Sequence, residues 1–372
     1  MPRTQTPTSV AAPALVEGRA TLEGTNRFRK RFAKTHGDNF YRELASGPFV
    51  SSLGLGTYLG ECDDTEDAHY RAAAGAALEK GVNLLDTAIN YRCQRSERAL
   101  GDAIRNAIAM RAIKREEIVI CTKGGYIPLE KSPPPTKDAY REFLDSEYFE
   151  RGVMEPGDVV GGGHCLTPRY LENQIERSRN NLGLAVIDLY YLHNPEQQLE
   201  SLGRPKFLDV MKDAFATLQN QVKRGVVGLY GCATWNGFRV PSDARNHLSL
   251  EELVSVARAV GGAKHHFRVI QLPINLAMTE AIRLPTQRLG TEYVPLLEAA
   301  RRLGISVIGS ATLMQSQLTR SLPKQVHAEF PGFKTDARRA IAFTQSLPVA
   351  SALVGMKSRA HLEENLAAPA IA

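Results

Sequence analysis

Four polar side chains next to apolar runs of this 372-residue sequence carry the groups that a proton transfer to a carbonyl needs. They are Asp86, Tyr91, Lys123 and His193. A tyrosine phenol with a pKa of about 10 is a weak acid at neutral pH, and a neighbouring ammonium group favours its phenolate. Tyr91 would therefore donate a proton to a carbonyl oxygen that becomes negative. Asp86 would hold Lys123 charged, and His193 would bind the same oxygen or share its proton.

Each of the four residues also has an ordinary structural explanation. Asp86 could cap a helix, as aspartates at strand ends often do. Tyr91 could lie at a rim, Lys123 could be a surface cation in a turn, and His193 could be a hydrogen-bonded core imidazole. Taken singly, each residue favours the structural explanation. The combination of an acid, a cation, a carboxylate and an imidazole favours chemistry.

The segments that must position these residues alternate regularly from about residue 50. Eight short runs are rich in β-branched and aliphatic residues, which is typical of strands. They cover residues 50–57, 82–86, 118–122, 186–193, 226–232, 267–272, 305–309 and 349–354. Helical signals lie between them: residues 99–108 repeat apolar side chains on one face. Thr167-Pro168 places proline at a first helical position, and Ser249-Leu-Glu-Glu252 forms a capping box.

Strand–helix units in series predict a parallel sheet with right-handed crossovers. Eight units in a chain of this length favour a closed (α/β)₈ TIM barrel over an open doubly wound sheet. The nearly continuous apolar runs fit strands that helices cover. No GxGxxG pattern follows the first strand, which disfavours a Rossmann domain. Asp86 and His193 end the second and fourth runs and Lys123 follows the third, so a barrel would bring them to one face.

The predicted organisation is an N-terminal extension over residues 1–49 and a single barrel domain over residues 50–372. Residues 1–20 are rich in proline, threonine and alanine and are predicted to be disordered. A helix follows, with Phe28 and Phe32 on its buried side. The basic run from Arg27 to Lys34 is read as its solvated face, with a contact to an anionic surface as the alternative.

Two irregular stretches interrupt the alternation. Residues 123–167 contain three consecutive prolines and three consecutive glycines, and predict a long loop after the third strand. Because such loops overhang the active-site face of a barrel, we expect a substrate lid. Residues 313–331 form a second irregular stretch after the seventh strand.

Charge and composition exclude several classes of protein. The 46 basic and 40 acidic side chains give a net charge of +6. This excess suits a phosphorylated cofactor and does not indicate nucleic-acid binding. No apolar stretch has the length of a membrane span, and residues 10–16 are too short for a signal peptide. The five cysteines form no CxxC pair, which favours the cytoplasm, and Cys121 and Cys232 are expected in the core.

Five sequence elements together resemble the aldo-keto reductase family. They are Gly54-Leu-Gly-Thr-Tyr58, Gly81-Val-Asn-Leu-Leu-Asp-Thr-Ala-Ile-Asn-Tyr91, Arg95-Ser-Glu97, Thr122-Lys123 and Asp188-Leu-Tyr-Tyr-Leu-His193. The similarity runs from about residue 50 to the C-terminus. It implies an (α/β)₈ barrel, NADPH rather than NADH as cofactor, and a small-molecule carbonyl or alcohol substrate. The catalytic residues that it implies are Asp86, Tyr91, Lys123 and His193.

The resemblance also implies a set of cofactor contacts. Gln271 matches the glutamine that binds the nicotinamide carboxamide, and Glu364 and Asn365 match the adenine-contacting pair. Lys357 and Arg359 lie in the segment that matches the loop near the 2′-phosphate, although either could be an ordinary surface cation. The full implied set is Gly56, Thr57, Tyr58, Thr234, Gln271, Ser310, Leu313, Lys357, Ser358, Arg359, Glu364 and Asn365.

The sequence departs from the family pattern at three places. The pair Ala233-Thr234 stands where the family has Ser-Asn after the fifth strand, and Thr234 could supply one of the two hydrogen bonds. Ser310 stands where the family often has an aromatic residue that stacks on the nicotinamide. His361 stands at a position that is commonly arginine. The changes leave the proton-donating group intact but weaken the expected hold on the cofactor.

Two other functions stay open. The departures motivate a regulatory or accessory barrel that binds the nicotinamide cofactor with little turnover. A metal-dependent enzyme using His164, Cys165 and His193 fits no standard ligand spacing. Candidate pocket residues are Tyr126, Phe149, His164, Trp235 and Phe238. The sequence does not indicate an oligomeric state.

Overall fold

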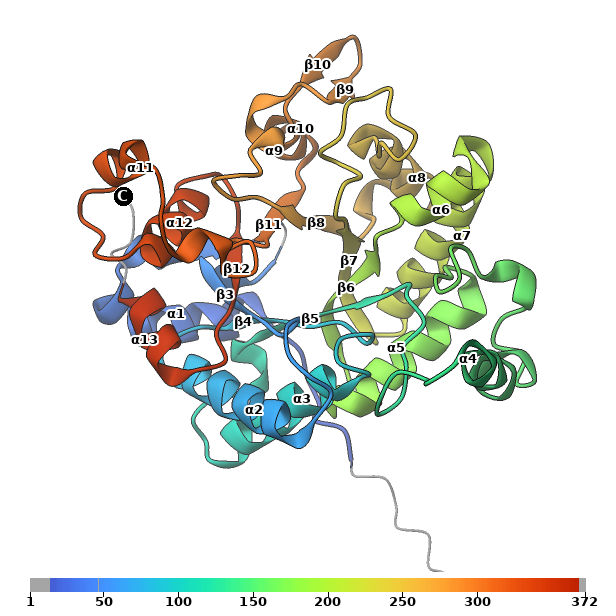
Figure 1. The fold of residues 1–372 in the computed structure, drawn as a ribbon, viewed down its shortest axis with the longest axis horizontal. Helices are drawn as coiled ribbons and strands as arrows, with labels where there is room; N and C mark the ends of the chain where they lie inside the picture. The colour runs from blue at the N-terminus through green and yellow to red at the C-terminus, as the bar shows by residue number, and fades with distance from the viewer. Residues whose placement is uncertain (1–13, 46, 368–372) are drawn as a thin grey trace, which may run out of the picture.

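The structure is a computed structural model that describes residues 14–45 and 47–367. Eight parallel strands close into a barrel in the order β11-β12-β3-β4-β5-β6-β7-β8, which confirms the predicted fold (Figure 1). The strands are β3 (Leu53–Gly56), β4 (Leu84–Asp86), β5 (Val119–Gly124), β6 (Ile187–His193), β7 (Val227–Ala233), β8 (Phe267–Pro273), β11 (Ser306–Ser310) and β12 (Ser351–Gly355).

A ring of helices surrounds the barrel (Figure 1). The main ones are α2 (Asp64–Glu79), α3 (Arg95–Ala109), α5 (Pro168–Leu182), α7 (Arg204–Lys223), α8 (Leu250–Gly261), α10 (Leu296–Leu303), α12 (Asp336–Gln345) and α13 (Arg359–Leu366). Shorter helices are α6 (Glu196–Leu202), α9 (Glu280–Arg283) and α11 (Lys324–Glu329). The predicted starts at Pro168 and Ser249 are confirmed, and the Ser249 hydroxyl accepts from the Glu252 amide.

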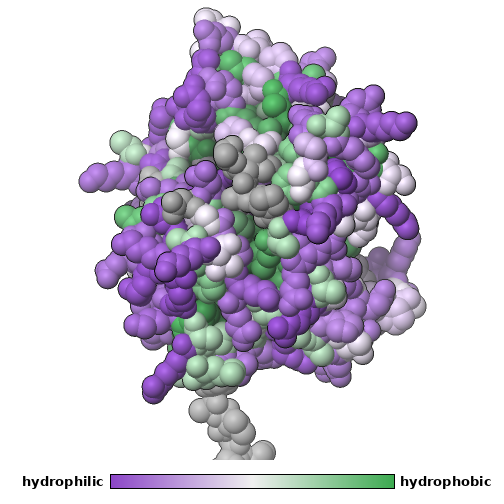
Figure 2. Space-filling model, turned by 90° about the vertical axis from the view of Figure 1, so that its left-hand side faces the viewer, coloured by the Kyte–Doolittle hydropathy of each residue, from purple (hydrophilic) through white to green (hydrophobic). Residues whose placement is uncertain are grey.

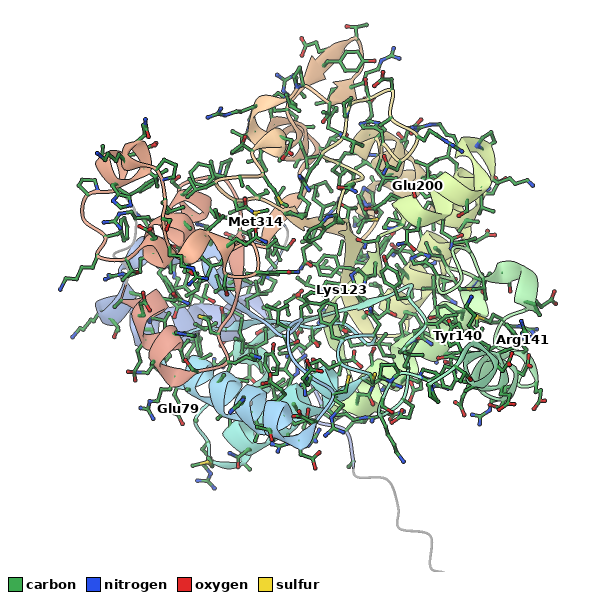
Figure 3. The ribbon with its side chains drawn as sticks, in the orientation of Figure 1. Glu79, Lys123, Tyr140, Arg141, Glu200 and Met314 are labelled. Carbon is green, nitrogen blue, oxygen red and sulfur yellow. The ribbon has the colours of Figure 1, made fainter. Side chains whose placement is uncertain are left out.

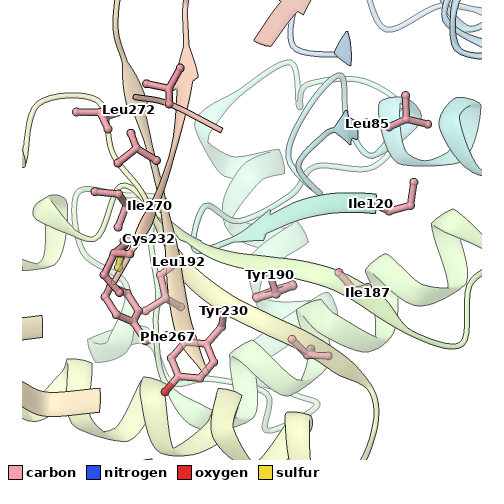
Figure 4. Packing of buried hydrophobic residues seen from close by; sticks show 14 of the residues in the cluster. Leu85, Ile120, Ile187, Tyr190, Leu192, Tyr230, Cys232, Phe267, Ile270 and Leu272 are labelled. Carbon is pink, nitrogen blue, oxygen red and sulfur yellow. The ribbon is translucent and has the colours of Figure 1, made fainter. Parts of the chain in front are cut away.

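Side chains alternate along each strand between the helices and the barrel interior. In β6, Tyr190 and Leu192 pack with the helix-side core, which Figure 4 shows together with Tyr230 and Phe267. Leu189 and Tyr191 belong instead to the interior cluster. Cys121 and Cys232 are fully buried on opposite sides of the barrel wall, as expected for core residues. The same alternation points the ends of β4, β5 and β6 into the barrel mouth.

The N-terminal extension is ordered further than the sequence predicts. Residues 1–13 lie outside the described residues, but residues 14–20 are placed, so the predicted disorder is wrong for them. Val16 forms a parallel bridge with Leu184, and the Ala20 amide donates to Asp188 Oδ1 over 2.7 Å. These bonds satisfy backbone groups that a disordered chain would leave to water.

The predicted helix of the extension is α1 (Leu22–His36), which buries Phe28. Arg27 and Arg31 of the basic run pair with Glu116 and Glu117, which favours a structural role for that part of the run. The antiparallel strands β1 (Tyr41–Glu43) and β2 (Phe49–Ser51) follow. The first predicted run, residues 50–57, thus covers parts of two strands, β2 and β3. The chain turns between them, where the Ser51 hydroxyl donates to the Leu53 carbonyl.

The long predicted loop over residues 123–167 is wrong in part, because the segment contains α4 (Lys137–Leu144) and the π-helical turn η3 (Asp145–Phe149). The Thr136 hydroxyl caps α4. Leu144, Tyr148 and Met154 then bury against Tyr170 of α5, which explains why the segment folds. The second irregular stretch likewise contains η6 (Gln317–Thr319) and α11.

The outer surface is polar on the side that carries α11 to α13. Figure 2 shows that side covered mostly by hydrophilic side chains, with apolar ones in narrow bands between them. Among the described residues, no helix combines the length and the apolarity needed to cross a membrane. A small antiparallel pair, β9 (Gln287–Leu289) and β10 (Glu292–Val294), projects beside α9 and α10.

Candidate active site

The four residues with proton-transfer chemistry converge at the carboxyl ends of β4, β5 and β6. Asp86 ends β4, Lys123 is the next-to-last residue of β5, His193 ends β6, and Tyr91 follows β4. Figure 3 places Lys123 at the centre of the barrel. Its Nζ donates to Asp86 Oδ1 over 2.6 Å and to the Thr87 carbonyl over 2.7 Å. The same ammonium lies 4.9 Å from the centroid of the Tyr91 ring.

Asp86 and Lys123 form a buried ion pair. Their side chains are 5% and 1% exposed. Burial lowers the pKa of Lys123, but the Asp86 carboxylate and the Tyr91 phenol outweigh it and bring the net pKa above its ordinary value. Lys123 is therefore held as an ammonium. Burial raises the pKa of Asp86, opposed by Lys123 and by Gln271.

Tyr91 behaves differently from the simplest expectation. Burial raises its pKa above the ordinary value, and the opposing effect of Lys123 does not overcome this. The phenol is therefore protonated at neutral pH. Its ring meets the ring of His193 edge-on, with centroids 5.7 Å apart, and the ring of Tyr58 at 5.0 Å. Tyr91 thus lies between Lys123 below and the open cavity above, where Tyr58 is 57% exposed.

His193 is a neutral imidazole at neutral pH. Burial lowers its pKa well below the usual value, and the positive charge of Lys123 acts in the same direction. Its Nδ1 is buried and has no hydrogen-bond partner among the described residues. A neutral ring has one N–H donor and one acceptor, so His193 can donate to a carbonyl oxygen without adding charge.

A hydrogen-bonded frame outside the site fixes the backbone of His193. His164 Nε2 contacts the His193 carbonyl oxygen over 2.7 Å, and Gln198 Nε2 lies 2.9 Å from His164 Nδ1. Burial lowers the pKa of His164 to about 4, so this ring is also neutral. Gly125 passes between them with a φ of +147°, and a Cβ there would come within 2.8 Å of His164 Nε2. Only glycine fits this crossing without strain.

Gln271 is tied to the ion pair. Its Nε2 donates to Asp86 Oδ2 over 2.8 Å, so the two Asp86 oxygens have separate partners. This bond orients the amide of Gln271, which also lines the cavity. The family resemblance implies a cofactor contact for Gln271, whereas its hydrogen bond to Asp86 has no signal in the sequence.

The cavity above the four residues has a volume of about 460 Å³. Its wall includes Tyr58, Asn90, Tyr126, Asn194, Thr234 and Ser310. Asp86 is the one charged side chain in its lining among the described residues, and Asp86 is already neutralised by Lys123. Asn90 Oδ1 and Thr234 Oγ1 are buried without a hydrogen-bond partner among the described residues. The wall can therefore offer hydrogen bonds to a neutral polar group.

The implied cofactor residues divide into three groups. Tyr58, Thr234, Gln271, Ser310 and Leu313 line the cavity. Gly56 and Thr57 lie just below it: Gly56 pairs with Gly355 in the sheet, and the Thr57 hydroxyl donates to the Asp86 carbonyl over 3.2 Å. The third group follows β12 and lies outside the cavity lining; it comprises Lys357, Ser358, Arg359, Glu364 and Asn365.

Residues of this third group are engaged within the protein. Lys357 Nζ donates to Glu66 Oε2 over 2.5 Å, and Glu66 belongs to α2. The Ser358 hydroxyl caps α13 by accepting from the His361 amide. Arg359 pairs with Glu363 on the exposed face of the same helix. Asn365 is buried, whereas Glu364 is partly exposed.

Glu196 is a functional candidate that the sequence analysis missed. It begins α6 just after β6, and its Oε1 accepts from the backbone amides of Trp235, Asn236 and Gly237 over 2.8, 3.1 and 3.3 Å. It thereby fixes the loop after β7, which carries Thr234 and Trp235 into the cavity wall. A short polar segment after a strand gave no signal that could single it out.

The candidate pocket residues lie in different places. Tyr126 and Trp235 line the cavity. His164 supports His193 from behind, Phe238 is a core residue, and Phe149 packs with the cluster around Tyr148.

The expectation of a substrate lid is wrong for residues 127–163. Of the segment between β5 and α5, only Tyr126 lines the cavity. Tyr140 and Arg141 lie at the outer edge of the molecule, far from Lys123 (Figure 3). The apolar face of the segment is used against Tyr170 of α5, which draws it away from the barrel mouth.

The metal hypothesis has no support in the geometry. Both ring nitrogens of His164 are already engaged, by the His193 carbonyl and by Gln198. Across the part of the chain that the structure describes, no three histidine, cysteine or acidic side chains gather as metal ligands. His164 instead holds the His193 backbone by a hydrogen bond, and Cys165 is buried in contact with the Thr167 hydroxyl.

Comparison with known proteins gives a family match. The model of the aldo/keto reductase family matches residues 52–339. Prostaglandin F synthase 1 of Bos taurus is 27% identical over 153 residues, which are 41% of this chain and 34% of that protein. D-threo-aldose 1-dehydrogenase of Pseudomonas sp is 28% identical over 162 residues, 43% of this chain and 42% of that protein. The chain thus matches less than half the length of either relative.

Solved structures show the same fold. An aldo-keto reductase from Bacillus halodurans in its holo form superposes with a TM-score of 0.59 at 18% identity, over 88% of this chain and 90% of that one. An aldo/keto reductase from Klebsiella pneumoniae in complex with NADP and acetate gives a TM-score of 0.57 at 18% identity, over 88% and 89%.

Proposed function

Because the chain belongs to the aldo/keto reductase family, we propose that it is an NADPH-dependent oxidoreductase that reduces an aldehyde or ketone to an alcohol, or catalyses the reverse. The observation that carries the proposal is the buried Asp86–Lys123 pair beneath Tyr91, at the floor of a cavity that His193 also lines.

The cavity wall fits a nicotinamide group. Thr234 and Gln271 both line this cavity, and the unpartnered Thr234 Oγ1 and the amide oxygen of Gln271 would hydrogen-bond a planar carboxamide. Thr234 would supply the hydrogen bond for which the family uses Ser-Asn, and Tyr58, Ser310 and Leu313 would form the surrounding wall. When bound, the cofactor supplies a hydride to the carbonyl carbon.

The chain's own residues handle the proton. Tyr91 donates its phenolic proton to the substrate oxygen, and Lys123 stabilises the phenolate that results. Asp86 keeps Lys123 charged and in place through the 2.6 Å contact. His193, which is neutral because of burial, donates a hydrogen bond that orients the carbonyl. The Asp86–Lys123 pair is itself buried, which strengthens the attraction between Lys123 and the phenolate.

The end of the cofactor that carries the 2′-phosphate would meet Lys357, Ser358 and Arg359, with Glu364 and Asn365 beside the adenine. A cation beside a phosphate forms a charge-assisted hydrogen bond, which supports NADPH. The likeness to a structure in complex with NADP supports the same choice. Glu66 counts against it, because its carboxylate holds Lys357 and would repel a phosphate.

The test is a pair of tyrosine variants that each lose one hydroxyl. Tyr91→Phe is expected to lower carbonyl reduction by at least about 100-fold, the effect of removing a general acid. Tyr140→Phe, on the outer edge of the molecule, is the matched control and is expected to keep full activity. NADPH binding, followed by fluorescence titration, should be unchanged in both variants. Full turnover by Tyr91→Phe would refute the assigned role.

The second candidate function is a regulatory or accessory barrel that binds the cofactor with little turnover. The altered positions Ala233-Thr234 and Ser310 favour it, because they weaken the expected contacts to the nicotinamide. Clear NADPH binding with no reduction across a broad panel of aldehydes and ketones would select this function instead.

We also propose a cytoplasmic location, because the five cysteines are free thiols, as is usual for proteins of a reducing compartment. Fractionation of the cells that make the protein would test this.

A further inference from the structure

Two free cysteines from different loops meet beside the candidate active site. Cys62 lies between β3 and α2, and Cys93 lies two residues after Tyr91. Their Sγ atoms are 3.3 Å apart, which is van der Waals contact. The other three cysteines are buried and do not pair with one another. Cys121 and Cys232 pack in separate core clusters, and Cys165 contacts the Thr167 hydroxyl.

Hydrogen bonds of Arg92 hold the two cysteine loops together. Arg92, the neighbour of Cys93, donates from Nε to the Glu61 carbonyl over 2.8 Å and from Nη2 to the Asp63 carbonyl over 3.2 Å. These two carbonyls flank Cys62. Arg92 also pairs with Asp67 of α2 over 2.7 Å. The guanidinium therefore fixes the loop of Cys62 against the loop of Cys93 before any bond forms between them.

The backbone around Cys93 is strained. Arg92, Cys93 and Gln94 have φ values of 51°, 53° and 70°, in the left-handed region that non-glycine residues seldom adopt. Such strain persists only where surrounding contacts impose it, and it gathers at switch and active-site segments. Here it lies directly after the tyrosine that the proposed mechanism uses.

We propose that Cys62 and Cys93 form a reversible disulfide when the protein meets a hydroperoxide, and that this bond switches the active site off. The bond itself requires only the geometry of the pair. Its effect on turnover rests on the proposed function of Tyr91.

The chemistry balances with a hydroperoxide as the two-electron oxidant. The Cys62 sulfur, which is partly exposed, attacks one peroxide oxygen; the O–O bond breaks, and the leaving oxygen takes a proton as water or an alcohol. Cys62 becomes a sulfenic acid. The Cys93 sulfur then attacks the Cys62 sulfur, the S–O bond breaks, and the hydroxyl leaves with the Cys93 proton as water. A dithiol reductant reverses the change.

The order of attack follows from the surroundings of the two thiols. Burial and the neighbouring Cys62 raise the pKa of Cys93 to about 12, so Cys93 is a thiol before Cys62 is oxidised and gives up its proton only as it attacks the sulfenic acid. Cys93 is only 5% exposed, which keeps a peroxide from reaching it first. Cys62 therefore meets the oxidant, and Cys93 serves as the resolving thiol.

The disulfide would displace the catalytic loop. A disulfide has an S–S length of about 2.05 Å, so the two sulfurs must approach by roughly 1.2 Å. Part of this movement falls on the strained segment that follows Tyr91. A misplacement of about 1 Å can lower a rate by about 100-fold. The bond also ties the loop of Tyr58, whose ring touches Tyr91, to the same segment.

Peptide mapping of the full chain tests the bond without any assay of turnover. Wild-type protein is treated with hydrogen peroxide, free thiols are alkylated, and the digest is searched for a Cys62–Cys93 cross-link that dithiothreitol removes. Wild type and the matched control Cys165→Ser should both form it. Cys62→Ser and Cys93→Ser should not, and Cys62→Ser alone suffices if the other variant fails to fold. No cross-link, or a cross-link between other cysteines, overturns the proposal.

Turnover of the same samples tests the switch. Oxidised wild type should lose at least tenfold of its carbonyl reduction and regain it with dithiothreitol, whereas Cys62→Ser should be insensitive to peroxide. A cross-link that leaves turnover unchanged overturns the switch. If reduced wild type shows no turnover, the proposed function fails, while the mapped cross-link still decides the chemistry of the pair.

Discussion

Replacing Lys123 by methionine tests whether the buried pair under Tyr91 is an ion pair. Two unit charges 2.6 Å apart attract by about 6 kcal/mol at an effective dielectric constant of about 20, and the cost of burying them offsets much of this. Removing one partner of a buried pair costs about 3–5 kcal/mol because the other charge is left unpaired. Gln271 still donates to Asp86, and Asp86 can take up a proton. We therefore expect a loss of about 3 kcal/mol at neutral pH.

The loss should depend on pH in a defined direction. Burial already raises the pKa of Asp86, and without Lys123 nothing but Gln271 opposes it. The carboxyl of the folded variant then has a pKa above its unfolded value of about 3.9. A group with a raised folded pKa contributes stability below the unfolded value and loses it as the pH rises through the folded pKa. The deficit of Lys123→Met relative to wild type should therefore be larger at pH 8 than at pH 5.

Equilibrium urea unfolding at both pH values measures the deficit. The control is the double variant Asp86→Asn/Lys123→Met, which removes both charges and should recover part of the stability, because no lone charge stays buried. A single variant that loses less than about 1 kcal/mol at pH 8, or a double variant that is no more stable than the single one, would refute the assignment of a buried ion pair. Both variants should be inactive in carbonyl reduction.

Three further predictions concern residues around the site. Glu66→Gln frees Lys357 from its ion pair and should tighten NADPH binding several-fold, with little effect on NADH binding. Fluorescence titration measures both affinities, and Glu79→Gln, at the other end of α2, is the control (Figure 3). Glu196→Ala leaves three backbone amides without their acceptor and should cost about 1–3 kcal/mol of unfolding free energy and raise KM. His164 is buried neutral with a pKa of about 4, so protonation of the unfolded chain should remove up to about 3 kcal/mol of stability as the pH falls from 6.5 to 4. His164→Gln should show a shallower loss in urea unfolding over that range.

The barrel could be predicted because strand alternation and helix capping are local signals. Pro168 and Ser249 begin helices where the sequence indicates, and Asp86 and His193 end strands as expected. The closed parallel sheet brings the ends of separate strands into one site. The closed sheet itself could be predicted from the number of strand–helix units.

The contacts of long side chains could not be predicted. The link from Gln271 to Asp86 spans 185 residues, and the ion pair of Lys357 with Glu66 spans 291. Nothing in the local pattern around Lys357 indicates that an acidic residue of α2 would reach it. Likewise, the segment after β5 looks like a loop by its prolines and glycines, yet Tyr148 has a partner in Tyr170 on which to fold.

The raised pKa of Tyr91 does not oppose its proposed role as proton donor. The pKa compares a buried phenolate with a phenolate in water, whereas the reaction compares it with another buried anion. Against phenol in water, a buried phenolate is costly, and burial therefore holds the resting residue in its acid form. During carbonyl reduction the alternative to a phenolate is an alkoxide in the same cavity, which is buried as well. The desolvation cost then largely cancels between the two anions, and the attraction of each to Lys123, 4.9 Å from the ring centroid, decides where the proton goes. Burial and Lys123 oppose each other in the pKa of the free residue, but in the reaction they cooperate: one keeps the proton on Tyr91 until it is needed, and the other receives the charge when it leaves.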